Sequence, residues 1–297
     1  MLQEFNEKNK DLKVSINGKI IHRDEGAVSV FDSVVQGGDA VWEGLRLYDE
    51  GIICLSHHLK RLQESAHTLA FNHIPKNEEI KSAIKEVLLA NNMTSGVHIR
   101  LTLTRGVKIT SGMDPRLNQS GCTLIIVPEY KEPVYDNADG IKVITSSQRR
   151  NNPQFLDSKI HHNNLLNNIL AKIESNVAGA DAALMLDEQG FASELHGTNI
   201  FMIKNDTVYT PYARNCLPGI TRGHIMDLCR QREIACQEAD LSLSQLYNAD
   251  FIFTTGTMGE LTPVVELDGR QIKSDRKIFN SIAGLFRETI KKYCETV

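Results

Sequence analysis

The pattern of apolar and polar positions predicts several β-strands in the first third of the chain. Residues 12–16 and 19–21 flank Asn17-Gly18, a dipeptide that accepts the positive φ angles of a tight turn, so they predict a hairpin. A second short strand pair is expected around residues 49–51. Residues 97–104 alternate over eight positions and predict a longer strand.

The strand predicted at 97–104 has one apolar face and one polar face. The polar face carries His98, Arg100, Thr102 and Thr104. An arginine in the middle of a strand, with polar neighbours on its own face, could line a polar cavity. A solvated outer face is the alternative, and the pattern alone favours it.

Other segments have the three- and four-residue apolar spacing of amphipathic helices. They are 59–69, 80–88, 165–177, a helix after Gly219, and 275–293. The helix at 165–177 has one continuous apolar stripe, and Asn163 or Asn164 is its expected N-cap.

The order of these elements predicts an α/β (α+β) protein of two domains. Residues 131–140 are polar and rich in turn-forming side chains, so they are expected to link a small N-terminal domain (1–130) to a larger C-terminal domain (141–297). Short buried strands are expected in the second domain at 141–145, 182–186, 199–203, 208–210 and 251–254.

Composition narrows the functional class. The 297 residues are 41% hydrophobic and 24% charged, with a formal net charge of -4, so neither nucleic acid nor an anionic membrane is expected as the main partner. No apolar run reaches the length of a membrane span, and residues 1–13 lack the apolar core of a signal peptide. Six scattered cysteines without a CxxC pair are expected to stay reduced, which favours the cytoplasm.

Candidate chemistry begins with two glycine- and threonine-bearing segments, 216–222 and 254–260. The first opens a predicted helix, where backbone N–H groups suit a phosphate, and the second follows a predicted buried strand. Together with a basic residue such as Arg61 they could form a phosphate cradle, although each segment alone is typical of an ordinary turn. Adjacent histidines, as in His57-His58 and His161-His162, point apart, so no metal site is expected.

Lys159, just before the predicted helix at 165–177, could be a reactive amine. A lysine held inside a pocket can form a Schiff base with a cofactor aldehyde, whereas most single lysines are exposed surface charges.

An ordered set of motifs resembles the class IV aminotransferases, which depend on pyridoxal 5'-phosphate (PLP), and among them the branched-chain enzymes. The motifs are WEGLRLY (42–48), HHLKRL (57–62), HIRLTLTRG (98–106), the region of Lys159, GFASELHGTNIF (190–201), LPGITR (217–222) and GTMGELTP (256–263). They cover nearly the whole chain, and LPGITR is the most specific of them.

The resemblance implies roles for the cofactor-binding residues. Arg61 is expected to hold the PLP phosphate, together with Gly219, Ile220 and Thr221 in one loop and Gly256 and Thr257 in another. Glu194 is expected to pair with the protonated pyridine nitrogen, and Asn199 to support the pocket.

Lys159 best matches the lysine that bonds the cofactor covalently and carries the substrate proton. The segment 159–165 is one or two residues longer than in relatives, and the tyrosine that usually lies near the cofactor is replaced by Asn164 or Leu165. If the helix anchors the comparison without a gap, His161 falls on the lysine position. We prefer Lys159 with an insertion, because loops absorb insertions at low cost.

On the substrate side, the resemblance points to pocket residues in both domains. They are Trp42, Arg46, His98, Arg100, Arg105 and Met258. Arg100 and Arg105 are both candidates for the substrate carboxylate, and Trp42 could form an apolar wall. His98 replaces a tyrosine that is common in the branched-chain enzymes, and Thr104-Arg105-Gly106 is similar to the D-amino acid branch.

The resemblance thus implies a two-domain fold-type IV PLP enzyme, with the cofactor site between the domains and a homodimer as the smallest assembly. The expected activity is transamination of an aliphatic, branched-chain amino acid with 2-oxoglutarate. A D-amino acid aminotransferase, an aminodeoxychorismate-lyase-like enzyme, or a non-catalytic member that binds PLP or another ligand is the alternative.

Overall fold

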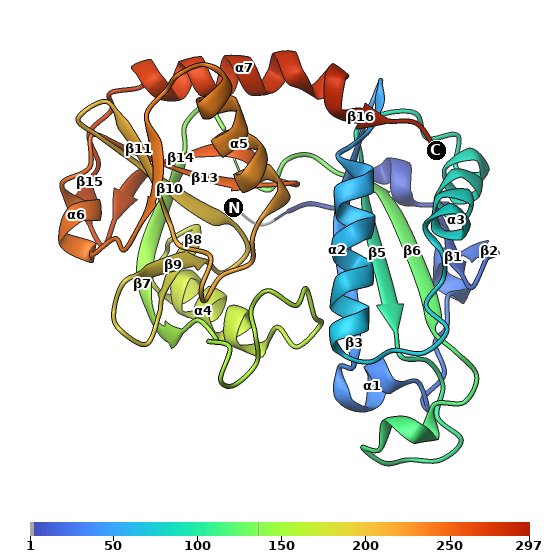
Figure 1. Ribbon diagram of the computed structural model, residues 1–297. Helices are drawn as coiled ribbons and strands as arrows, with labels where there is room; N and C mark the ends of the chain where they lie inside the picture. The colour runs from blue at the N-terminus through green and yellow to red at the C-terminus, as the bar shows by residue number, and fades with distance from the viewer. Residues whose placement is uncertain (1–2, 136) are drawn as a thin grey trace. The chain divides into compact units, whose positions relative to one another are not determined.

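The computed structural model describes residues 3–135 and 137–297, which form two compact units. The first unit contains residues 3–132, 160–164 and 293–297, and the second contains the described residues of 133–159 together with 165–292 (Figure 1). Residues 1–2, and Asp136 of the predicted linker, lie outside the described residues. The sequence predicted that the chain passes from one domain to the other only once, near 131–140. In the structure, the segment 160–164 and the C-terminal residues also group with the first unit.

The first unit is built on a seven-stranded sheet, whose strand order is β16-β4-β3-β5-β6-β1-β2, and all its pairings are antiparallel. The strands are β1 (Lys13–Ile16), β2 (Lys19–His22), β3 (Ala40–Tyr48), β4 (Gly51–Ile53), β5 (Val97–Thr104), β6 (Thr123–Tyr130) and β16 (Cys294–Glu295). The hairpin β1–β2 turns at Asn17 and Gly18, which have φ angles of 50° and 77° as the sequence predicted.

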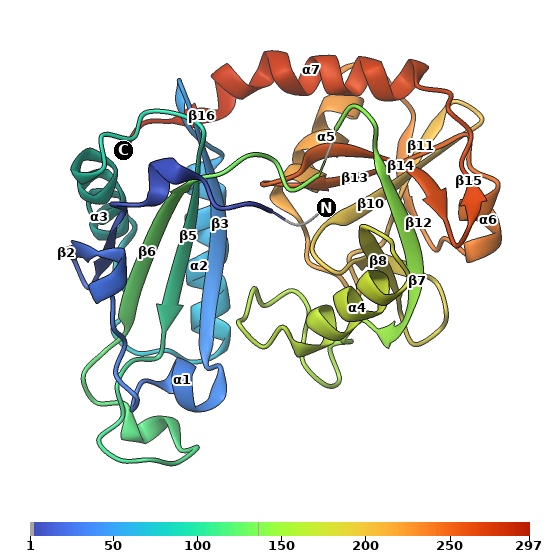
Figure 2. The ribbon, with the colours of Figure 1, turned by 180° about the vertical axis from the view of Figure 1, so that it is seen from behind.

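Two helices cover one face of this sheet, as Figures 1 and 2 show from opposite sides. They are α2 (Leu55–Thr68) and α3 (Asn77–Ala90). Their apolar stripes, which include Leu59, Leu62, Ile80 and Ile84, are fully buried in the core of the unit. Each such side chain contributes about 2 kcal/mol through burial. A short helix, α1 (Ser33–Gly37), and three 3-10 turns (Glu7–Asn9, Arg23–Glu25 and Pro115–Leu117) complete the unit.

The second unit is built on a nine-stranded mixed sheet with the order β12-β11-β10-β13-β14-β7-β8-β9, and β15 pairs with β14. The strands are β7 (Ile141–Arg149), β8 (Ala182–Leu186), β9 (Ala192–Leu195), β10 (Asn199–Lys204), β11 (Thr207–Pro211), β12 (Cys236–Ala239), β13 (Phe251–Gly256), β14 (Glu260–Leu267) and β15 (Arg270–Gln271). The neighbours β14–β7, β7–β8 and β11–β12 are parallel, and the other pairs are antiparallel.

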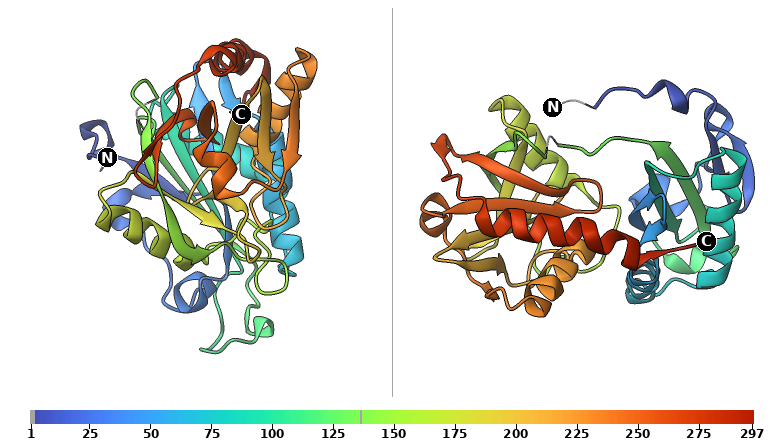
Figure 3. Two further views of the ribbon diagram at one scale, coloured as in Figure 1. Left: turned by 90° about the vertical axis from the view of Figure 1, so that its left-hand side faces the viewer. Right: turned by 90° about the horizontal axis from the view of Figure 1, so that it is seen from above.

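The two faces of this strongly twisted sheet have different packing partners (Figure 3). One face gathers an apolar core that includes Val143, Leu184, Met202 and Ile252. The other face packs against helices. They are α4 (Leu166–Val177), α5 (Ile220–Gln231) and α7 (Lys277–Tyr293), and a short helix, α6 (Leu243–Tyr247), precedes β13. No helix among the residues described is long and apolar enough to cross a bilayer.

Two expectations from the sequence are wrong. The polar face of β5 is not a solvated outer face, because His98, Thr102 and Thr104 are buried. The helix α4 begins at Leu166 after Leu165 at the N-cap position, with no side-chain cap bond, so neither Asn163 nor Asn164 caps it. Residues 160–164 are engaged elsewhere, as described below.

The apolar stripe of α4 is present but faces outward. Its members are Leu166, Ile169, Leu170, Ile173 and Val177, which are 44–85% exposed. The helix instead turns Ala171 and Ser175 toward the sheet. Periodicity predicted the stripe correctly but could not say whether its partner belongs to the same chain.

Candidate active site

In the first unit, three ionisable side chains converge on one buried carboxylate. Glu43 lies on β3 and has no exposed surface. Its Oε1 accepts a hydrogen bond from Nε of Arg61 (2.8 Å), and its Oε2 accepts one from Nη2 of the same residue (2.7 Å). Nδ1 of His58 lies 2.7 Å from Oε2, and Nδ1 of His161 lies 3.2 Å from Oε1. We call Glu43, His58, Arg61 and His161 the Glu43 group.

The charge states within the Glu43 group follow from its burial. Burial by itself would raise the pKa of Glu43, but the charge of Arg61, with His161 as a further partner, holds that pKa well below its ordinary value. Burial lowers the pKa of His161 to about 4, although the Glu43 carboxylate acts in the opposite direction. At neutral pH the group therefore contains an ionised Glu43 and a neutral His161, whose Nδ1–H donates to the carboxylate.

The segment 160–164 is bonded along the start of β3, chiefly through Trp42. The backbone N–H of Trp42 donates to the carbonyl of His161 (2.9 Å), and its indole Nε1–H donates to the carbonyl of His162 (3.2 Å). The ring of His161 lies against the indole, with ring centroids 4.1 Å apart. The N–H of Asn163 donates to the carbonyl of Ala40 (2.9 Å). Both the backbone and the side chain at position 161 are therefore fixed in the first unit.

Arg100, Arg46 and His98 extend this polar region along β3 and β5. The guanidinium of Arg100 lies over the Trp42 ring, 3.4 Å from its centroid, and donates from Nη2 to Asn163 Oδ1 (3.0 Å). Arg46 pairs with His98 across the strands and donates to the carbonyl of Lys131. Burial, with the charges of Lys131, Arg100 and Arg46, lowers the pKa of His98 to about 3. The face is therefore positively charged and carries a neutral imidazole.

Arg105, the second predicted carboxylate ligand, is held by the protein itself. Nε and Nη2 donate to the two carboxylate oxygens of Asp39, at 2.5 and 3.2 Å. The remaining contacts are to the carbonyls of Leu69 and Ala70, and the guanidinium lies over Phe71. These contacts give Arg105 a structural role in the first unit and leave Arg100 as the better-placed candidate.

In the second unit, Glu194 is the centre of another buried polar group. Arg150 Nε donates to Oε1 (2.5 Å), and Asn199 Nδ2 donates to Oε2 (3.1 Å). The N–H of Leu217 lies 3.3 Å from Oε1, and Asn199 also donates to the carbonyl of Leu217 (3.0 Å). We call Arg150, Glu194 and Asn199 the Glu194 group, and these bonds join it to the loop that leads into α5.

The start of α5 adjoins the same residues. Gly219 is its N-cap, and a Cβ atom there would lie 1.9 Å from Oδ1 of Asn199, so only glycine fits. Ile220 and Thr221 form the first turn, whose N–H groups have no partner within the helix. Asn199 pairs with Thr255 on β13, so the end of that strand also lies next to Asn199.

Buried polar atoms without a partner mark this part of the second unit. Among the residues that the structure describes, no partner is found for Oγ1 of Thr198, Oγ1 of Thr255 or Nη1 of Arg150. Thr198 adjoins Gly256, the last residue of β13, and Thr257 and Met258 follow in the next turn. Three buried polar atoms without a partner beside a helix N-terminus are typical of a binding site for a polar ligand.

Lys159 and His161 have contrasting surroundings although only one residue separates them. The side chain of Lys159 is exposed, its backbone N–H donates to Asp157 Oδ1 (3.0 Å), and the residue groups with the second unit. The side chain of His161 is 12% exposed and groups with the first unit. The role predicted for Lys159 stays a prediction.

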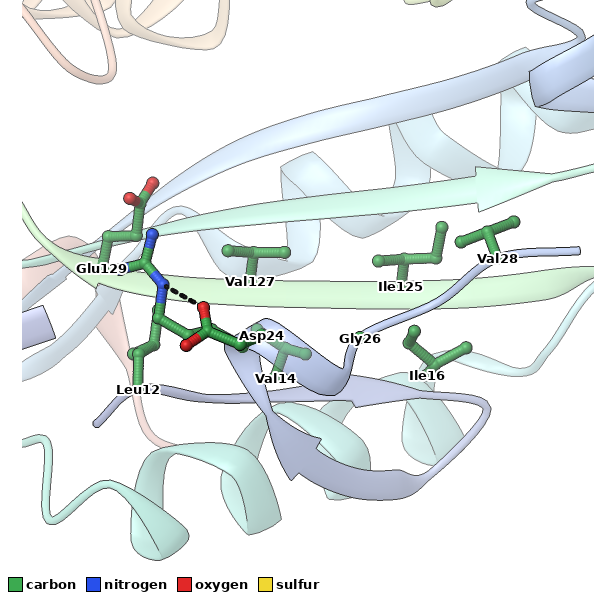
Figure 4. Close-up of a pocket in the computed structure, with 10 residues that line it drawn as sticks. Leu12, Val14, Ile16, Asp24, Gly26, Val28, Ile125, Val127 and Glu129 are labelled. Atoms are coloured by element: carbon green, nitrogen blue, oxygen red, sulfur yellow. Dashed lines mark ion pairs between the residues drawn. The ribbon is translucent and has the colours of Figure 1, made fainter. Parts of the chain in front are cut away.

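A cavity of about 310 Å³ in the first unit lies apart from all the predicted site residues (Figure 4). It is lined by Leu12, Val14, Ile16, Arg23, Asp24, Gly26, Val28, Ile125, Val127 and Glu129. No group of His, Cys, Asp or Glu in the described part of the chain could hold a metal ion.

Comparison with known proteins identifies the family. The model of the Amino-transferase class IV family matches residues 40–267. The chain belongs to the class IV aminotransferases. It is 57% identical over 264 residues to the Branched-chain-amino-acid aminotransferase-like protein 2 of Arabidopsis thaliana, and these residues are 89% of this chain but only 47% of that protein. The chain thus spans about half the length of this relative.

Two further relatives match over nearly their full lengths. The Putative branched-chain-amino-acid aminotransferase of Methanocaldococcus jannaschii is 39% identical, over 89% of this chain and 90% of that protein. The solved structure of the branched-chain amino acid aminotransferase from Escherichia coli has a TM-score of 0.85 and 28% identity, over 96% of each chain. The predicted fold-type IV architecture is therefore confirmed.

Class IV aminotransferases use PLP, and the second unit fits this group. Glu194 offers a fixed carboxylate for the pyridine N–H, while the N–H groups of Ile220 and Thr221 and the unpartnered hydroxyl of Thr255 suit a phosphate. When bound, PLP supplies an aldehyde and an electron-withdrawing ring.

Sequence reasoning missed several members of these groups. Glu43, His58 and Thr198 stand within the quoted motifs WEGLRLY, HHLKRL and GFASELHGTNIF but received no role, and Arg150 lies outside these motifs. Thr255 lies in the segment 254–260 predicted for the phosphate cradle but was not singled out there. An acidic residue in a stretch, 40–45, that otherwise holds only apolar residues and glycine was the available signal for Glu43. The three partners that stabilise its buried carboxylate come from positions 58, 61 and 161, and the pattern of the strand contains no information about them.

Proposed function

We propose that this chain binds PLP and transfers the amino group of an aliphatic, branched-chain L-amino acid to 2-oxoglutarate. The observation that carries the proposal is the Glu194 group, in which one buried carboxylate is oriented by Arg150 and Asn199 next to the start of α5. A carboxylate held in this way would bond the pyridine N–H and keep the ring protonated.

The phosphate ligands that we propose lie at two loops of the second unit and on α2. The second unit contributes Gly219, Ile220, Thr221, Gly256 and Thr257, with the hydroxyl of Thr255, from the predicted segment 254–260, as a further donor. Arg61 remains the proposed ligand from α2, and the two bonds from its guanidinium to Glu43 would fix its orientation. A fixed guanidinium loses less entropy when it binds an anion.

For the substrate, we propose that Arg100 holds a carboxylate and that Trp42 forms an apolar wall. Arg100 is fixed by Asn163 and by the Trp42 ring, which favours bidentate binding in one orientation. Burial lowers the pKa of Arg100 to about 10, which still leaves it charged at neutral pH. Arg46, His98 and Met258 are proposed as further lining residues. All three guanidinium nitrogens of Arg105 donate to acceptors of the protein, which argues against its use for substrate.

Two assignments compete for the residue that faces the cofactor aldehyde. With an insertion before α4, Lys159 would carry the cofactor covalently. With the helix as anchor, His161 stands there, and the cofactor would be bound without a covalent link.

We also propose a homodimer in which the apolar stripe of α4 is covered by a second copy of the chain. Five outward-facing apolar side chains on one helix favour burial in an assembly. The double variant Ile169→Lys/Ile173→Lys is expected to sediment as a monomer, whereas Asn176→Lys, an exposed change on the same helix, is expected to leave the assembly intact. A wild-type monomer at micromolar concentration would contradict this part.

The activity is tested with a panel of amino donors and 2-oxoglutarate. We expect keto acid formation from L-leucine, L-isoleucine and L-valine, and a loss of kcat/KM of about 100-fold or more in Glu194→Gln. Glu188→Gln, which changes an exposed carboxylate just before β9, serves as the matched control. Turnover of D-alanine or D-glutamate alone would instead support a D-amino acid aminotransferase.

A second candidate function is PLP binding without transamination. It is favoured by the exposure of Lys159 and the burial of His161. PLP binding with no turnover of any donor would support it. Product formation without a keto acid acceptor would instead indicate a lyase.

A further inference from the structure

The segment 160–164 brings an imidazole, and no amine, into the Glu43 group. We propose that His161 takes the place of the covalent lysine in this chain, and that PLP is held by reversible contacts only. The inference rests on the proposed function, because it assumes that the chain binds PLP.

The backbone evidence is that hydrogen bonds hold position 161 in one register with β3. The carbonyls of His161 and His162 both accept hydrogen bonds from Trp42, and the N–H of His161 donates to Ser65 Oγ at 3.1 Å. The N–H of Asn163 forms a further hydrogen bond with β3 by donating to the carbonyl of Ala40. A shift of two residues, which would bring Lys159 to this place, would remove the contacts that the side chain of His161 makes with Glu43 and Trp42.

The side-chain evidence is that the pocket around position 161 is built for this imidazole. His161 Nδ1 is bonded to Glu43, and its ring lies on the Trp42 indole at 4.1 Å. Arg61 Nη2 lies 3.4 Å from the same nitrogen. Stacking on Trp42 and the hydrogen bond to Glu43 thus both fit the imidazole of His161.

Lys159 has none of these contacts. Its side chain is exposed and lacks the enclosure by which proteins make lysine amines nucleophilic. The chain leaves the second unit directly after Lys159, and α4 follows from Leu166 without a break in its helical pattern. The surroundings of the two side chains therefore favour position 161, which is the lysine position if the helix anchors the comparison without a gap.

The chemistry of the two side chains separates the assignments. A carbon–nitrogen double bond to an aldehyde needs a primary amine, which gives up two hydrogens as water together with the aldehyde oxygen. An imidazole ring nitrogen has at most one hydrogen and cannot do this. Because its Nδ1–H is donated to Glu43, His161 retains an unprotonated Nε2, which can accept a proton.

The test is borohydride reduction of the PLP-loaded protein followed by peptide mass spectrometry. In the wild type we expect no PLP-modified lysine and complete loss of PLP on gel filtration. His161→Lys is expected to gain a borohydride-fixed PLP on residue 161. Lys159→Ala is expected to keep the wild-type dissociation constant for PLP, measured by equilibrium dialysis.

Two results would contradict the inference. A PLP-modified Lys159 in the wild type, lost in Lys159→Ala, overturns the inference and leaves the proposed function standing. Absence of PLP binding at equilibrium overturns both. If His161→Lys fails to fold, which circular dichroism would show, the wild-type and Lys159→Ala peptide maps still decide between Lys159 and His161.

Discussion

The ring of His161 lies against the ring of Trp42, with centroids 4.1 Å apart and planes tilted by 38°. The two residues are 119 positions apart in the sequence and are also joined by a backbone hydrogen bond of 2.9 Å. Trp42 thus fixes the segment 160–164 through its backbone, its indole nitrogen and its ring.

Shortening Trp42 is expected to destabilise the protein. Trp42→Ala should lower the free energy of unfolding by about 2 kcal/mol, since a half-buried ring loses its contacts. Trp42→Phe keeps the stacking surface and loses only the indole hydrogen bond, so a loss of about 1 kcal/mol is expected. Urea unfolding followed by circular dichroism measures both, and equal losses would argue against a stacking contribution.

Removal of the charge at Glu43 is expected to lower the free energy of unfolding more than either change at Trp42. Glu43→Gln leaves Arg61, His58 and His161 around a neutral amide, and breaking a buried ion pair costs about 3 to 5 kcal/mol. Asp114→Asn removes an ion pair with Arg116 on the surface and is expected to cause no measurable change. If Glu43→Gln and Asp114→Asn lowered the free energy of unfolding equally in urea, the larger contribution expected from the buried ion pair would be contradicted.

Three histidines with lowered pKa values are expected to make stability fall in mild acid. The folded-state pKa of His98 is about 3, and those of His161 and His196 are about 4, well below the ordinary value of 6.5. The unfolded chain therefore binds more protons between those values, so the stabilising contribution is complete above pH 6.5 and is lost as the pH falls below it. Each histidine contributes a slope of up to about 1.4 kcal/mol per pH unit.

Unfolding measurements at several pH values check this assignment. His98→Gln should reduce the slope by roughly one proton relative to the wild type. His57→Gln, which changes an exposed histidine, is the control and should keep the wild-type slope. Identical slopes in all three proteins would show that His98 does not stay neutral in the folded state.

Gly219, at the start of α5, is expected to be essential for PLP affinity, whereas Gly223 in the same helix is expected to be dispensable for it. Gly219→Ala would place Cβ 1.9 Å from Asn199 Oδ1 and displace the amide that bonds Glu194. We expect PLP affinity to fall by about 10- to 100-fold. Gly223→Ala meets no atom within 4 Å and is expected to stabilise the helix by about 0.5 to 1 kcal/mol with unchanged affinity.

Among the six cysteines, Cys236 is expected to react first with iodoacetamide. A hydrogen bond from the Cys229 thiol lowers its pKa, helped by Arg222 and Arg230 against the effect of burial. The pKa is raised in the other five, which are Cys54, Cys122, Cys216, Cys229 and Cys294. Time-resolved peptide mapping gives the order, Cys236→Ser is the control, and earlier modification of Cys122 would refute the assignment.

The sequence by itself determined the local elements and the family. Strands such as Val97–Thr104 and Ala182–Leu186 were predicted with their observed bounds, because alternation and short apolar runs are local properties. The ordered motifs sufficed for the class IV resemblance, and with it the PLP site proposed around Glu194, Asn199 and Gly219.

Only the tertiary structure decided which side chains meet. Burial of Glu43 depends on partners from α2 and from a segment more than a hundred residues later, and no local pattern encodes such a return of the chain. The outward direction of the α4 stripe and the different surroundings of Lys159 and His161 are likewise set by packing. Periodicity fixes which residues share a face, whereas the contacts of that face depend on the folding of the whole chain.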